Sequence, residues 1–68
     1  MKLYKAVDKM TEQICAFLVY PNGEVAASYW AFSEAEEADL AKQCAEGYLR
    51  EPAERFKDAI DPVLIAEW

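Results

Sequence analysis

Two cysteines and a cluster of carboxylates are the residues of this 68-residue chain whose types could support chemistry. Cys15 and Cys44 have no CxxC spacing and the chain contains no histidine, so we expect no metal centre and no cofactor. A nucleophilic cysteine needs a lowered thiol pKa. Cys15 stands in an apolar run, and Cys44 stands late in an expected helix, whose dipole opposes a thiolate. We therefore expect inert, reduced thiols and no catalytic residues, with a disulfide between the two as the alternative.

The carboxylate cluster has two interpretations. Its members are Glu34, Glu36, Glu37 and Asp39. The plainer interpretation is a solvated helix start, because negative charge is favoured at a helix N-terminus. The sharper one is a docking patch, extended by Glu24, Glu46 or Glu51, that presents closely spaced carboxylates to a basic groove. A metal site is less favoured, because one helical turn spreads these side chains over different faces.

The charge balance restricts the class of partner. Thirteen Asp and Glu residues against seven Lys and Arg residues give a net charge of −6. Direct binding of nucleic acid or of an anionic membrane needs a basic face, which this composition does not favour. An acidic chain suits a protein partner with a basic surface, including proteins that handle DNA or RNA. The same charge also keeps a small protein soluble.

A hairpin over residues 13–32 is the clearest element. Two apolar runs flank Pro21-Asn22-Gly23, which predicts a three-residue loop with a type I turn and a glycine bulge. The strand pairs expected from this loop are Val19 with Val25, Leu18 with Ala26, Phe17 with Ala27, Ala16 with Ser28, Cys15 with Tyr29, and Ile14 with Trp30.

Both faces of this hairpin are apolar, although a solvated antiparallel sheet normally alternates apolar with polar residues. One face carries Cys15, Phe17, Val19, Val25, Ala27 and Tyr29, and the other carries Ile14, Ala16, Leu18, Ala26, Trp30 and Phe32. We therefore expect one face to pack on the core. The other face should be covered by a further helix, by a second copy or by a foreign partner.

Two helices are expected after the hairpin. Ser33 and Glu36 form a capping box for the first helix, which reaches towards Arg50. Pro52 suits the first turn of the second, which ends at Asp61-Pro62. The fold prediction is an α+β domain over residues 1–68: a small antiparallel sheet, with the hairpin 13–32 at its centre and both helices packed on one face.

The two chain ends each allow two structures. Residues 3–7 alternate loosely and favour a strand, while apolar residues at helical spacing over 2–12 allow a helix. Residues 63–68 favour a strand because of their β-branching, with a short helix as the alternative. No targeting segment is visible and the apolar run 14–20 is too short to span a bilayer, so we expect a soluble, cytoplasmic protein.

These features predict a non-enzymatic protein-binding module. Tyr20, Trp30 and Trp68 are candidate contact residues because Tyr and Trp are enriched at interface hot spots, although aromatics in so small a domain are mostly core. A hairpin followed by an acidic helix resembles, in architecture, small antitoxins and phage-encoded inhibitors such as anti-CRISPR proteins. That likeness favours a stoichiometric inhibitor of a nucleic-acid-handling complex. The alternative is a structural homodimer that self-associates through the second apolar sheet face.

Overall fold

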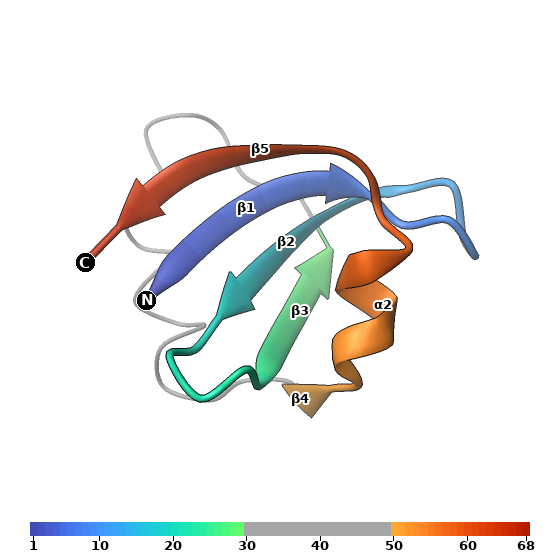
Figure 1. The fold of residues 1–68 in the computed structure, drawn as a ribbon. Coiled ribbons are helices and arrows are strands. Elements are labelled where there is room, and N and C mark those ends of the chain that lie inside the picture. The colour runs from blue at the N-terminus through green and yellow to red at the C-terminus, as the bar shows by residue number, and fades with distance from the viewer. Residues whose placement is uncertain (30–49) are drawn as a thin grey trace.

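A computed structural model of the chain describes residues 1–29 and 50–68. These residues form a five-stranded antiparallel sheet in the order β4-β3-β2-β1-β5, with one short helix (Figure 1). The elements are β1 (Lys2–Val7), β2 (Ile14–Val19), β3 (Val25–Tyr29), β4 (Arg50–Glu51), α2 (Ala53–Lys57) and β5 (Ile60–Glu67). Because β5 returns to lie beside β1, the two chain ends meet, and the ammonium group of Met1 donates a hydrogen bond to the Trp68 carbonyl at 2.8 Å.

The expected α+β arrangement, a hairpin with two helices on one face, is wrong. Over residues 1–29 and 50–68 a sheet dominates, and α2 is the only helix and has five residues. The first expected helix falls on residues 33–49, outside the described residues. The second was expected to reach Asp61 but ends at Lys57, because the segment from Ile60 onward pairs with β1 instead. A helix of this length depends on packing rather than on its own propensity.

The central hairpin has the register that its turn predicts. Every expected pair from Val19–Val25 to Cys15–Tyr29 is present between β2 and β3, and the expected partner of Ile14 lies outside the described residues. Gly23 has a φ of +89°, its N–H donates to the Tyr20 carbonyl at 3.0 Å, and the Tyr20 N–H donates to the Glu24 carbonyl at 2.9 Å. Glycine accepts this left-handed conformation without a steric penalty, so the turn residues fix the strand pairing.

The N-terminal segment is a strand, and the helical alternative for residues 2–12 is wrong. β1 pairs with β2 over its whole length, from Lys2 opposite Val19 to Val7 opposite Ile14. In this position the backbone N–H and C=O groups of β1 form hydrogen bonds with two neighbouring strands, β2 and β5. They therefore need no helix to satisfy them.

The C-terminal strand is confirmed and is longer than expected. Asp61 and Pro62, expected to end a helix, lie inside β5, where a register shift places these two residues opposite the single residue Ala6 of β1. Asp61 has a φ of +51°, and Pro62 has no N–H to donate. Proline and bulges are tolerated on edge strands, and β5 occupies an edge of this sheet.

Both faces of the hairpin are buried within one copy of the chain. Cluster one, on one face, consists of Leu3, Ala16, Leu18 and Ala26, with Met1, Tyr20, Ile65 and Ala66 packed against it. Cluster two, on the other, consists of Ala6, Cys15, Phe17, Val25 and Ala27, with Tyr4, Val19, Ala53, Phe56 and Ala59 packed against it. Of the three expected ways to cover the second face, a further helix, a second copy or a foreign partner, the structure shows the first, since Ala53 and Phe56 of α2 pack against cluster two.

Phe56 shows how the short helix closes cluster two. Its ring lies 4.9 Å from the ring of Tyr4 and 5.4 Å from that of Phe17, between centroids. These tilted contacts join α2 to β1 and β2 and bury large aromatic surfaces. No helix within the two described ranges is long and apolar enough to cross a membrane.

Candidate functional site

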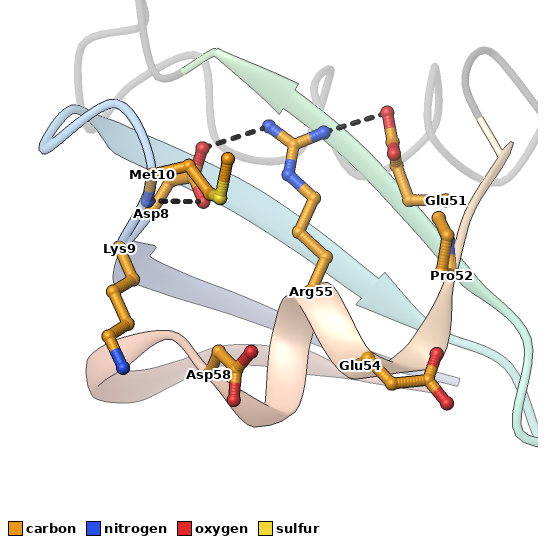
Figure 2. Close-up of a pocket in the computed structure, with 8 residues that line it drawn as sticks. All are labelled: Asp8, Lys9, Met10, Glu51, Pro52, Glu54, Arg55 and Asp58. Carbon is orange, nitrogen blue, oxygen red and sulfur yellow. Dashed lines mark hydrogen bonds and ion pairs between the residues drawn. The ribbon is translucent and has the colours of Figure 1, made fainter.

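Arg55 connects three separate parts of the chain across one face of the sheet. Its Nη1 lies 2.7 Å from Glu51 Oε1 and its Nη2 lies 3.3 Å from Asp8 Oδ2, so the guanidinium bridges β4 and the loop after β1 (Figure 2). Its Cζ also lies 5.9 Å from the centroid of the Phe17 ring, within range of a cation–π contact. We call Asp8, Glu51 and Arg55 the Arg55 clamp. Only a quarter of the Arg55 side chain is exposed.

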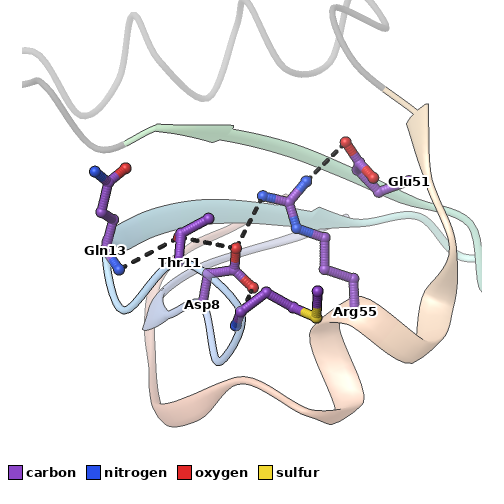
Figure 3. Close-up of polar contacts among 6 residues, drawn as sticks. Asp8, Thr11, Gln13, Glu51 and Arg55 are labelled. Atoms are coloured by element: carbon purple, nitrogen blue, oxygen red, sulfur yellow. Dashed lines mark hydrogen bonds and ion pairs between the residues drawn. The ribbon is translucent and has the colours of Figure 1, made fainter.

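Asp8 is the buried member of the clamp and is 3% exposed. Its carboxylate accepts hydrogen bonds from Thr11 Oγ1 at 3.0 Å, from Arg55 Nη2 at 3.3 Å and from the Met10 N–H at 3.5 Å (Figure 3). Burial alone would raise the pKa of this carboxyl group. The Thr11 and Met10 hydrogen bonds and the charge of Arg55 outweigh burial and hold the Asp8 pKa below its ordinary value of 3.8.

A pocket of about 600 Å³ opens beside the clamp. We call it the Met10 pocket, and it is lined by Asp8, Lys9, Met10, Glu51, Pro52, Glu54, Arg55 and Asp58 (Figure 2). Met10 is 91% exposed, which is unusual for a large apolar side chain. Glu54 and Asp58 lie one helical turn apart and form no ion pair with another described residue.

An apolar patch lies on the other face of the sheet, at the end where β1 finishes. Val7 pairs with Ile14 of β2 and with Ile60 of β5, so these three side chains form a row on one face. Val63 extends the row because it pairs with Lys5, two residues before Val7. We call Val7, Ile14, Ile60 and Val63 the sheet patch. The exposed fractions of Ile14, Ile60 and Val63 lie between 45% and 57%.

The sheet patch adjoins cluster one. Leu3, a fully buried member of that cluster, lies on the same face of β1 as Val7. The face is therefore buried at the Leu3 end and open at the Val7 end. An exposed apolar surface that continues a core is a common feature of binding sites.

Cys15 is a free, fully buried thiol, as the sequence predicts. Burial is the largest influence on its thiol and raises the pKa, and the charge of Arg55 opposes this without reversing it. Cys44 lies outside the described residues. Within 1–29 and 50–68, no three acidic, cysteine or histidine side chains gather closely enough to hold a metal ion.

Three of the predicted contact residues lie near the hairpin turn or the C-terminus. Lys2 pairs with both Val19 and Glu67, so the turn that holds Tyr20 and Glu24 is near the C-terminus. Tyr20 is half-buried against cluster one and Glu24 is exposed. Trp68 is 53% exposed, while its backbone N–H donates to the Met1 carbonyl at 3.0 Å. The remaining predicted contacts lie outside the described residues: Trp30, Glu34, Glu36, Glu37 and Asp39.

Comparison with known protein families, with curated proteins and with solved structures finds no match to this chain.

Proposed function

We propose that this chain is a non-enzymatic protein-binding module that acts by occupying the surface of a basic partner. The sheet patch is the observation that supports this proposal. The described members of both hydrophobic clusters are buried, yet a row of branched aliphatic side chains stays exposed beside one of them. An exposed apolar row lowers solubility and so is better explained by a contact than by stability.

The concrete form of the proposal is a stoichiometric inhibitor of a nucleic-acid-handling complex. The net charge of −6 favours association with a protein whose surface is basic because it holds DNA or RNA. A cytoplasmic location belongs to the same proposal, since a free buried thiol suits a reducing compartment.

The homodimer alternative has lost its main support. It needed an uncovered sheet face, and both faces of the hairpin are buried in a single copy. The four residues of the sheet patch are far fewer than the roughly 20–30 residues a side of a standard interface. Two copies that each carry −6 also repel one another, whereas a basic partner is attracted and can extend the contact onto acidic neighbours.

The test is capture of a partner with a patch variant and a matched control. The variant Ile14→Thr/Ile60→Thr/Val63→Thr keeps the β-branching that strands favour and removes apolar surface. The control is Leu64→Thr, in the same strand, which pairs with Tyr4 and so lies on the opposite face. We expect the patch variant to weaken the affinity for the captured, purified partner at least about tenfold.

Two results would contradict the proposal. One is equal binding of the partner by the patch variant and the wild type, and the other is an equal loss in the Leu64→Thr control. The inhibitor form also requires binding to weaken steeply as salt rises, because exposed charges are screened beyond roughly 10 Å at 0.1 M salt. Binding that is indifferent to salt would exclude an electrostatic partner.

A further inference from the structure

Residues 52–59 cross one face of the sheet from edge to edge. β4 and β5 occupy opposite edges of the described sheet, so the chain between them has to pass over a face. Ala53, Phe56 and Ala59 pack against cluster two, which shows that this is the face it crosses (Figure 1). We call residues 52–59 the strap. Because β4 and β5 hold its two ends, the middle of the strap can lift without either strand leaving the sheet.

The strap is attached to the sheet by side chains. Its backbone hydrogen bonds close within it, from the N–H groups of Arg55, Asp58 and Ala59 to the carbonyl groups of Pro52, Glu54 and Phe56 respectively. None of the residues of α2 is buried, and α2 packs on each strand far less extensively than the strands pack on one another. A helix of five residues is not stable by itself, so the strap keeps its shape only while these side-chain contacts last.

Two neighbouring residues make the contacts that hold the strap against the sheet. Arg55 forms an ion pair at 3.3 Å with Asp8, which lies in the loop after β1. The ring of Phe56 packs on the rings of Tyr4 and Phe17. Segments with few buried apolar contacts open at a lower free-energy cost than the core strands around them. The strap should therefore open more readily than the sheet beneath it.

The strap covers part of β2. Cys15 and Phe17 are fully buried and lie on the same face of this strand. Arg55 Cζ lies 5.9 Å from the centroid of the Phe17 ring. The charges of Arg55, Asp8 and Glu51 all act on the Cys15 thiol, so the Arg55 clamp lies close to it. Opening of the strap would therefore uncover the Cys15 thiol on this face.

We propose that the strap opens as a unit while the sheet stays folded, and that the Arg55 clamp is the latch that keeps it closed. The open form exposes the Cys15 thiol and the ring of Phe17, and the closed form hides both. The strap thus controls access to the cluster-two face of the hairpin. This inference does not depend on a partner, because the strap lies over cluster two and the sheet patch lies on the other face.

The test measures how fast iodoacetamide alkylates Cys15 at increasing urea concentrations, below and through the unfolding transition. Mass spectrometry of the peptide that contains Cys15 gives the rate for this thiol alone. At a reagent concentration low enough for reclosing to outpace labelling, the rate is proportional to the open fraction. We expect the rate to change little at low urea, because a short strap exposes little surface, and to rise steeply only where the whole chain unfolds.

Variants in the strap and away from it separate the two kinds of opening. Phe56→Leu removes the ring contacts and should raise the alkylation rate without urea about tenfold. Glu51→Gln is a milder change that releases Arg55 from β4 and should raise this rate about threefold. The control is Gly23→Ala, in a turn that stays formed when the strap opens. It should leave the rate without urea unchanged and raise the rate in the steep region about fivefold.

Three results would each overturn the proposal. The first is an alkylation rate that follows global unfolding over the whole range of urea, since Cys15 would then be reached only through complete unfolding. The second is an equal effect of Gly23→Ala and Phe56→Leu on the rate without urea. The third is a rate that stays level at low urea but responds to neither Phe56→Leu nor Glu51→Gln, because the opening that exposes Cys15 would then not be that of the strap.

Discussion

Replacing Asp8 with asparagine should destabilise the fold markedly, although the two side chains have nearly the same size. Asp8 is 3% exposed and its carboxylate accepts three hydrogen bonds, from Thr11, Arg55 and the Met10 backbone. Asparagine keeps one oxygen and places an amide N–H₂ against one of these donors. Hydrogen bonds to charged groups contribute about 1.5–3 kcal/mol each. Because Arg55 keeps Glu51, we expect the free energy of unfolding to fall by about 2 kcal/mol.

The loss of stability caused by Asp8→Asn should become smaller at low pH. The folded-state pKa of Asp8 lies below the ordinary value of 3.8, so folding favours the ionised carboxylate. Its contribution is therefore fully present above pH 3.8 and is lost as the pH falls through the lower, folded-state pKa. Asparagine does not titrate in this range. The difference between wild type and Asp8→Asn should be largest near neutral pH and should shrink as the pH falls below about 4.

Urea unfolding followed by circular dichroism at several pH values measures the free energy of unfolding and its dependence on pH. A loss of about 2 kcal/mol corresponds to a fall in Tm of about 10 °C for a domain of this size. The control is Asp61→Asn, an exposed carboxylate on β5, for which we expect a change below about 0.5 kcal/mol. A difference between wild type and Asp8→Asn that stays constant with pH, or that is no larger than in the control, would refute the role given to the Arg55 clamp.

Two further predictions concern the turn and the buried thiol. Gly23→Ala should lower the free energy of unfolding by about 1 kcal/mol because of its φ of +89°, since an added Cβ meets no atom within 4 Å and the cost is one of backbone conformation alone. Gly23→Asn should cost less, and unchanged stability of the alanine variant in urea unfolding would contradict the left-handed turn. Cys15, whose thiol pKa is raised by burial, should react with iodoacetamide at least about 100-fold more slowly in the folded protein than in urea. Mass spectrometry of the peptide that contains Cys15 measures both rates, and similar rates would show that the thiol is accessible.

The sequence predicts local structure well where one short segment decides it. Pro21, Asn22 and Gly23 determine the turn, and the turn determines the register of β2 and β3. The β-branched tail was predicted as a strand on similar grounds. Its earlier start at Ile60 was missed, because Asp61 and Pro62 read as a helix stop and only the pairing with β1 shows that a bulge accommodates them.

Contacts that join distant segments could not be predicted. Asp8 and Arg55 are 47 residues apart, and neither has a sequence signal that pairs it with the other. The prediction of what covers each face of the hairpin is incomplete for the same reason. It considered the hairpin alone, while Leu3 of β1 and Phe56 of α2 belong to the packing on its two faces. The sheet patch likewise became visible only once Val7 was known to lie between Ile14 and Ile60.

The most direct test of this account is the mass of the folded protein in solution. If one copy buries both faces of its sheet, sedimentation equilibrium should give 7.7 kDa up to millimolar concentration, and the Tm should not change with concentration. A species of twice that mass, with a Tm that rises with concentration, would show that a second copy completes the core and would contradict the account.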